Sequence, residues 1–118
     1  MTLREAVVNY QYGERIKAFL ISAAGLLAEL EHFKQEELAP AVRLYKSYLD
    51  QVRGEIRLVR NITGMPGLAE VEAKLKEATW EVHINRRDEA SVRLGEAISL
   101  TTTATVKAAE LLKKEGLL

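Results

Sequence analysis

Apolar residues recur every three or four positions through four segments of the chain. The first two segments carry unbroken seams of heptad spacing, at Tyr12, Ile16, Phe19, Ala23, Leu26, Leu30 and Phe33, and at Leu38, Val42, Tyr45, Leu49, Val52, Ile56 and Val59. This spacing puts the side chains of each seam on one side of an α-helix, and it is typical of helices that pack in coiled-coil fashion. We therefore expect two long helices, each with its seam facing a shared core.

Two further segments complete the pattern. Their inward positions are expected at Leu68, Val71, Leu75, Ala78 and Val82 in one, and at Leu94, Ala97, Ile98, Thr101, Ala104, Ala108 and Leu111 in the other. At about 1.5 Å per residue the third helix spans only about 25 Å, against about 45 Å for the first. Helices 1, 2 and 4 are thus predicted to be long and helix 3 to be shorter.

The boundaries of the first two helices are indicated by capping and loop residues. Thr2 and Glu5 have the spacing of a capping box at the start of the first helix. Pro40 suits a first turn and disfavours a helical residue before it, so the second helix is expected to begin near Pro40. Residues 61–67 combine Gly, Pro and polar residues and predict a loop after this helix.

Similar signals bound the fourth helix. Asn85 or Asp88 is expected to cap its start, and Gly116 suits the left-handed conformation that ends a helix. Because the connections are short, neighbouring helices must run antiparallel. The sequence therefore predicts an all-α protein, an antiparallel up-down-up-down four-helix bundle, with residues 1–118 forming a single domain.

Composition narrows the classes of function. The formal net charge is zero and Cys is absent, so neither a general attraction to nucleic acid or membranes nor thiolate chemistry is expected. No secretory leader pattern or membrane-length apolar run is present, which predicts a cytoplasmic protein. Scarce Asn and Gln beside abundant Glu, Lys and Arg resemble the composition of thermophile proteins.

The first helix carries more apolar surface than one seam requires. Residues 18–28 are apolar or small on nearly every side, interrupted only by Ser22. A short third helix would also leave part of its neighbours uncovered. Both features favour a homodimer, and we expect Leu20, Ala24 and Leu27 to take part in self-association.

The second helix carries the most distinctive charge pattern. Its basic residues share one stripe, at Arg43, Lys46, Arg53, Arg57 and Arg60, in which Asp50 is the only acid in register. Such a stripe could follow a phosphate backbone and bind nucleic acid. Alternatively, ion pairs with Glu70, Glu77 and Glu81 of the third helix would neutralise it.

Candidates for chemistry are few. Glu29 and His32 have the Glu-x-x-His spacing of metal-binding helices, but a second such pair is missing, since Trp80 precedes His83 by three residues. His83 itself has no nucleophile placed near it by sequence, so no catalytic residue is assigned. No phosphate-binding loop or dinucleotide fingerprint is present, and no cofactor is expected.

The fourth helix contains a run of threonines, Thr101–Thr105, interrupted by Ala104. Thr is a poor helix former, so the run calls for an explanation. A narrow helix that lets its neighbours approach closely is one reading; a polar pocket lined by hydroxyls, open to a small ligand, is the other.

These features favour a non-enzymatic structural or interaction protein that self-associates and serves as an adaptor or small subunit, with an unidentified protein partner. Two other hypotheses stay open. One is a nucleic-acid-binding module that uses the basic stripe, and the other is a bundle that binds a small ligand or a metal.

Overall fold

The computed structural model describes all residues, 1–118, and 87% of them are helical. The helices are α1 (Leu3–Glu29), α2 (Gln35–Thr63), α3 (Leu68–His83) and α4 (Arg87–Lys114), and a short 3₁₀ turn, η1 (Leu30–His32), follows α1. The predicted all-α class is confirmed. The third helix is the shortest, with 16 residues against 27 in α1.

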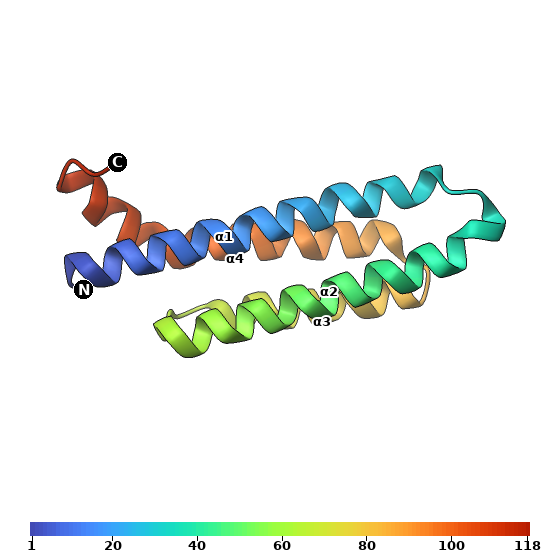
Figure 1. Ribbon diagram of the computed structural model, residues 1–118, viewed down its shortest axis with the longest axis horizontal. Helices are drawn as coiled ribbons and strands as arrows, with labels where there is room; N and C mark the ends of the chain where they lie inside the picture. The colour runs from blue at the N-terminus through green and yellow to red at the C-terminus, as the bar shows by residue number, and fades with distance from the viewer.

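The helices form an up-down-up-down bundle in which each helix contacts two neighbours. The contacting pairs are α1–α2, α2–α3, α3–α4 and α4–α1, whereas the diagonal pairs do not meet. The bundle is elongated, 54 × 24 × 18 Å (Figure 1). The N-terminal part of α1 and the C-terminal part of α4 extend beyond the turn between α2 and α3. No helix combines the length and the apolar character that crossing a membrane requires.

Two helix ends follow the local signals in the sequence. At the start of α1, the Glu5 amide donates to the Thr2 hydroxyl at 3.1 Å and the Thr2 amide donates to the Glu5 carboxylate at 3.3 Å. At the end of α4, Gly116 has φ 74°, and the Leu117 amide donates to the Leu112 carbonyl at 2.8 Å. These are the expected capping box and Schellman motif.

The start of α2 corrects one prediction. The helix begins at Gln35, five residues before Pro40, which lies inside it. The ring of Pro40 removes only the hydrogen bond to the Glu36 carbonyl, and both residues are exposed, so water can satisfy that carbonyl. The Glu37 carboxylate accepts from the Lys34 amide at 3.4 Å and marks the true start.

The start of α4 corrects another. Asn85 adopts a left-handed conformation, φ 61°, and ends α3 instead of capping α4. The Arg86 amide donates to the Glu81 carbonyl at 2.7 Å, and the Asn85 amide donates to the Val82 carbonyl at 3.1 Å, which is a second Schellman motif. Asn tolerates this conformation better than other residues that carry a side chain.

The core is formed by the predicted seams of α2 and α3, by a shifted seam on α1, and by Ala90, Leu94 and Ala97 of α4. The α3 seam is buried throughout, and the α2 seam is buried from Tyr45 onward. On α1 the buried positions are Ala6, Gly13, Ile16, Leu20, Ala23 and Leu27, and Leu30 of η1 continues the row. Leu26 and Phe33, which the sequence assigned to the seam, are each 46% exposed. The seam shifts because α1 packs against α4 as well as α2, so its inward side is turned toward Leu20 and Leu27.

Beyond the turn between α2 and α3, α1 and α4 pair with each other alone. A small separate core there consists of Ala6, Ala108 and Leu112. Between this cluster and the main core, Gly13 of α1 lies against the side chain of Thr105 of α4. The two helices therefore pack closely at the point where the four-helix bundle becomes a pair.

Candidate functional site

Part of the basic stripe of α2 is neutralised by α3. Arg57 Nη2 lies 2.6 Å from Glu72 Oε1, and Arg60 Nη1 lies 3.2 Å from Glu72 Oε2. The Glu72 side chain is largely buried between the two arginines and is 12% exposed. The sequence placed the partners of the stripe at Glu70, Glu77 and Glu81. The observed partner, Glu72, lies closer to α2.

The other basic residues of the stripe have weaker local partners. Lys46 Nζ lies 3.0 Å from His83 Nδ1, and Arg53 lies 3.5 Å from Asp50. Arg43 makes no ion pair. The structure thus keeps the five side chains on one side of α2 but does not present them as an open cationic track.

Glu77 and Glu81 of α3 pair across to α4. Arg93 Nε lies 3.2 Å from Glu77 and 3.3 Å from Glu81, and the Arg93 guanidinium also binds Glu96. The hydrogen bond with Glu96 raises the pKa of Arg93, and hydrogen bonds from Arg93 and Lys74 lower the pKa of Glu96. The surface between α3 and α4 is therefore covered by an ion-pair network.

The residues considered for metal binding and catalysis are not brought into working groups. Glu29 ends α1, His32 lies in η1, and both are exposed. No cluster of three or more His, Asp or Glu side chains that could hold a metal occurs anywhere in the structure. His83 contacts Lys46 and the Trp80 ring, with ring centroids 5.5 Å apart, and has no carboxylate beside it to orient its imidazole.

The threonine run of α4 makes local hydrogen bonds. The hydroxyls of Thr101, Thr102, Thr103 and Thr105 all donate to backbone carbonyls three or four residues earlier in the helix. A hydroxyl engaged in this way has no donor left for a ligand. Of the two readings, close helix packing at Gly13 therefore has the support of the structure.

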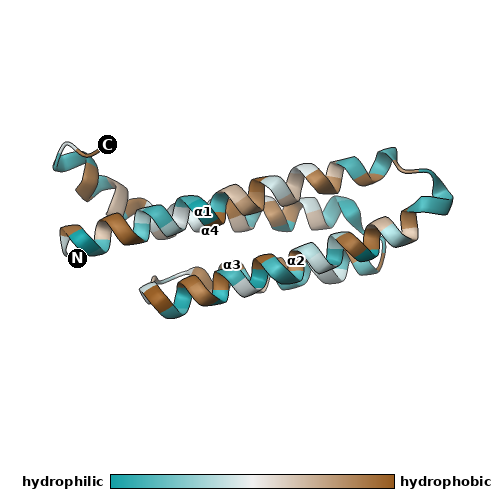
Figure 2. Cartoon of the chain, in the orientation of Figure 1, coloured by the Kyte–Doolittle hydropathy of each residue, from teal (hydrophilic) through white to brown (hydrophobic).

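Two of the residues expected to mediate self-association lie inside the monomer. Leu20 and Leu27 are 0% and 4% exposed and belong to the main core, and Ala24 is half-buried. α1 does carry more apolar residues than its core-facing side uses, but the residues that remain exposed are not the ones that the sequence indicated. In Figure 2, residues 18–28 of α1 form a brown and pale stretch of ribbon between hydrophilic, teal segments.

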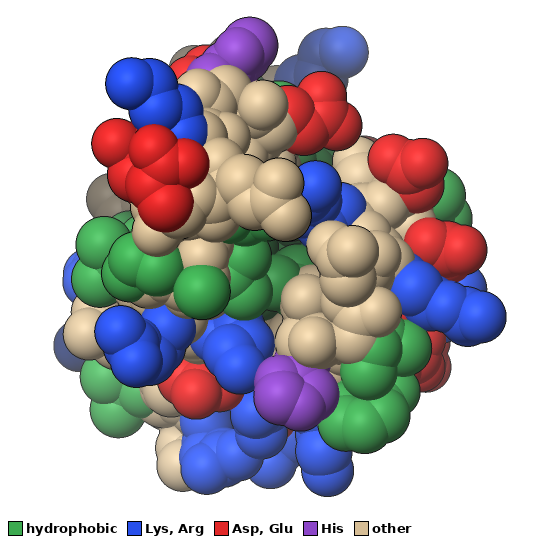
Figure 3. Space-filling view, turned by 90° about the vertical axis from the view of Figure 1, so that its right-hand side faces the viewer, with side chains coloured by type: hydrophobic (Ala, Val, Ile, Leu, Met, Phe, Trp, Pro, Cys, Tyr) green, Lys and Arg blue, Asp and Glu red, His purple; other side chains and the backbone are tan.

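A charge-poor surface runs along the outer side of α1 and α2. We define the α1–α2 face by its exposed residues, which are Ala18, Ser22, Gly25 and Leu26 on α1, and Pro40, Leu44, Ser47, Gln51, Leu58 and Ile62 on α2. None of these side chains is charged, and Leu44 is 74% exposed. In the end-on view of Figure 3, one group of hydrophobic side chains lies on the left, where α1 and α2 lie, and a second lies at the lower right.

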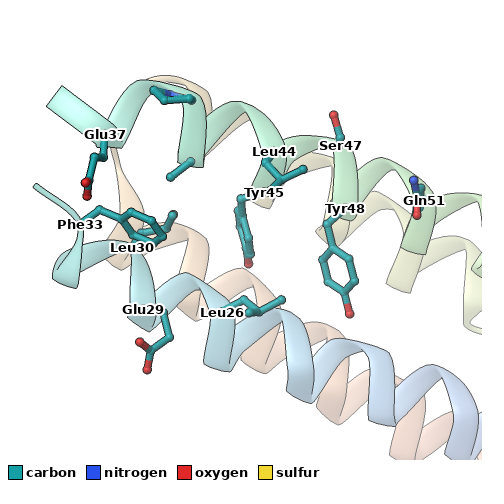
Figure 4. Close-up of a pocket in the computed structure, with 12 residues that line it drawn as sticks. Leu26, Glu29, Leu30, Phe33, Glu37, Leu44, Tyr45, Ser47, Tyr48 and Gln51 are labelled. Carbon is teal, nitrogen blue, oxygen red and sulfur yellow. The ribbon is translucent and has the colours of Figure 1, made fainter. Parts of the chain in front are cut away.

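A groove of about 840 Å³ lies within this face, between the second half of α1 and the first half of α2. Leu26, Leu30 and Phe33 line it from α1 and η1, and Leu44 and Tyr48 are among the residues that line it from α2 (Figure 4). The carboxylates of Glu29 and Glu37 stand at its rim. An apolar floor with charge only at the rim resembles the core and rim of a protein interface.

Two tyrosines connect α2 to α1 along the groove. The Tyr45 hydroxyl donates to the Ala23 carbonyl at 2.6 Å, and the Tyr48 hydroxyl donates to the Phe19 carbonyl at 3.4 Å. Figure 4 shows both rings reaching from α2 toward α1. Burial raises the pKa of the Tyr45 hydroxyl above its usual range, so it stays protonated and keeps its hydrogen bond. The groove is thus held at a fixed width.

The sequence contains a signal for this face that the seam analysis passed over. Leu44, Gln51 and Leu58 follow one another at intervals of seven residues, on the side of α2 that faces away from the seam. A second heptad row on an otherwise charged helix indicates a second packing surface.

Comparison of the chain with family models, with curated proteins and with solved structures finds no match in any of the three.

Proposed function

We propose that the protein is a non-enzymatic interaction protein that self-associates through the α1–α2 face and serves as a small subunit or adaptor. The observation that carries the proposal is the uneven distribution of charge. The sides built by α3 carry several ion pairs to α2 and α4, whereas the α1–α2 face is crossed by the single Arg15–Glu55 ion pair, and its groove is lined by uncharged side chains apart from Glu29 and Glu37.

Burial of this face would remove a substantial apolar area from water. Leu44, Leu58 and Ile62 are each more than half exposed in the monomer. Complete burial of one such side chain contributes about 1.5–3 kcal/mol. Leu44 lies in the groove, and exposed apolar surface of this kind is typical of interaction sites.

The polar groups of the face suit packing better than chemistry. Ser22, Ser47 and Gln51 are small or uncharged hydrogen-bonding side chains, and the tyrosine hydroxyls that line the groove already donate to backbone carbonyls of α1. A helix laid on this face would have to satisfy Ser22, Ser47 and Gln51 with hydrogen bonds, which polar side chains of a second helix can supply.

Replacing Leu44 with Glu is the direct test. A buried carboxylate without a partner would oppose association, so the dissociation constant of the wild-type assembly should rise at least tenfold, which corresponds to about 1.4 kcal/mol. Leu44 is exposed in the monomer, so circular dichroism and thermal melting of the dilute protein should stay close to wild type. Sedimentation and native mass spectrometry would measure the assembly against the 13.2 kDa protomer.

Val106→Glu is the matched control, because Val106 is an exposed apolar residue on α4, outside the α1–α2 face. It should leave association unchanged. A wild-type protein that remains monomeric at high micromolar concentration would refute the proposal, as would equal weakening by the two variants.

A further inference from the structure

The residues that α1 contributes to the centre of the α1–α2 face are small and uncharged, and charged residues of opposite sign lie at the two ends. Arg15 precedes it, Glu29 follows it, and Ala18, Ser22 and Gly25 lie between them on the same side of the helix. Arg15 and Glu29 are 14 residues apart, which corresponds to about 21 Å along the axis and nearly four complete turns. Ser22 lies midway, seven residues from each.

This charge order is self-complementary only when two copies run antiparallel. If a second α1 crosses the first at Ser22 in the opposite direction, Arg15 of each copy meets Glu29 of the other. A parallel pair would place Arg15 beside Arg15 and Glu29 beside Glu29, which is repulsive. A two-fold symmetric contact of this type closes on itself and gives a dimer.

Glu29 is free to make this contact, and Arg15 is accessible although it already pairs with Glu55. Glu29 is exposed and makes no ion pair within the monomer, and in Figure 4 its carboxylate points away from α2. Arg15 has a single partner, Glu55, at 3.4 Å, and its side chain is still 56% exposed. The guanidinium also lies 5.6 Å from the centre of the Phe19 ring, which keeps it on this side of α1.

We infer that the occupant of the α1–α2 face is a second copy of this chain, packed antiparallel about a two-fold axis near Ser22, with an Arg15–Glu29 ion pair at each end of the α1–α1 contact. The inference rests on the proposed self-association and specifies its geometry. At Gly25 no atom lies within 4 Å of the place a Cβ would occupy, so a second backbone can approach α1 closely there.

The proposed two-fold axis also passes close to the middle of α2. The hydrogen bonds from Tyr45 to Ala23 and from Tyr48 to Phe19 place this part of α2 alongside the middle of α1. Ser47 of α2 therefore lies level with Ser22 and close to the proposed axis. On both helices the residue at the axis is small and neutral, and Leu44 of each copy of α2 would lie against the other copy near its Gln51.

The test exchanges the two charges one at a time and then together. In the antiparallel dimer, Arg15→Glu and Glu29→Arg each create like-charge contacts at both ends, and each should raise the dissociation constant about tenfold at low salt. The double variant Arg15→Glu/Glu29→Arg recreates both attractive contacts and should return to within about threefold of wild type. Analytical ultracentrifugation at low and high salt measures all four proteins.

The position of Glu29 at the end of α1 allows an effect on folding to be separated from an effect on association. Glu29 stands at the C-terminal end of α1, where a cation favours the helix dipole, so Glu29→Arg should not lower the melting temperature of the protein diluted until it is monomeric. Glu110→Arg makes the same charge change on an exposed residue of α4 and should leave the dissociation constant unchanged.

The outcomes of these experiments distinguish the antiparallel geometry from the proposed self-association on which it rests. A monomeric wild type refutes both. A dimer that Leu44→Glu dissociates, but that none of the charge variants affects, keeps self-association through the α1–α2 face and overturns the antiparallel geometry. Failure of the double variant to recover association, when each single variant weakens it, also overturns the geometry.

Discussion

Replacement of Leu20 with Ala should lower the free energy of unfolding by about 3 kcal/mol, whereas the same change at Leu26 should lower it by less than about 1 kcal/mol. Leu20 is completely buried in the main core, so its truncation leaves a cavity, and Leu26 is 46% exposed at the edge of the groove. Urea unfolding of the dilute proteins, followed by circular dichroism, gives both values.

This pair of variants distinguishes the two seams of α1. The heptad row read from the sequence contains Leu26 and omits Leu20, and the observed core contains Leu20 and omits Leu26. A larger loss at Leu26 than at Leu20 in the dilute proteins would mean that α1 is rotated from the orientation described.

Gly13→Ala should destabilise the protein by about 2 kcal/mol, even though Ala favours a helix over Gly by about 1 kcal/mol. A Cβ on residue 13 would overlap the Cγ2 methyl of Thr105 and lie 3.3 Å from its Cβ. The three nearest atoms all belong to the Thr105 side chain, and buried residues lie on either side along α1 and α4, so there is little room for α4 to move away.

Thr105→Ser in the same chain should recover most of that loss, because it removes the overlapping methyl and retains the hydroxyl that donates to the Thr101 carbonyl. Thermal melting of the two single variants and the double variant completes a thermodynamic cycle. A Gly13→Ala protein that melts above wild type would show that α1 and α4 are farther apart at this point.

The sequence predicts α2 and α3 well because each has one inward stripe and charged residues on its other sides. Tyr45, Leu49 and Val52 have no rival set of apolar residues that could face the core instead. α1 differs, since Leu20 and Leu26 belong to two overlapping rows that are equally apolar. The choice between them depends on how α4 packs, which local spacing does not encode.

The helix ends divide in a similar way. Thr2 and Gly116 act through contacts within a few residues, so their roles can be read from the sequence. Pro40 and Asn85 each allow two local interpretations, and the hydrogen bonds of the neighbouring turns select one. The partner of Arg57 and Arg60 depends on the register between α2 and α3, so the sequence located the acidic helix but not Glu72.

The sequence indicated the kind of candidate site, an apolar surface on α1, but not the residues that form it. The apolar excess of residues 18–28 correctly indicates that α1 has more to cover than one seam. Which residues remain exposed follows only after the core has taken Leu20 and Leu27. The outer row of α2, which begins at Leu44, likewise becomes clear only once the core residues are known.

Two regions of the molecule differ in their resistance to local unfolding: the four-helix region, and the ends of α1 and α4 that pair with each other alone. Only Ala6, Ala108 and Leu112 are fully buried there, in a cluster separate from the main core. These turns can part and rejoin at little free-energy cost while the four-helix region stays closed. Their backbone amides are therefore open to exchange with solvent deuterium long before those of α2 and α3, and a protease would reach this end of the protein first.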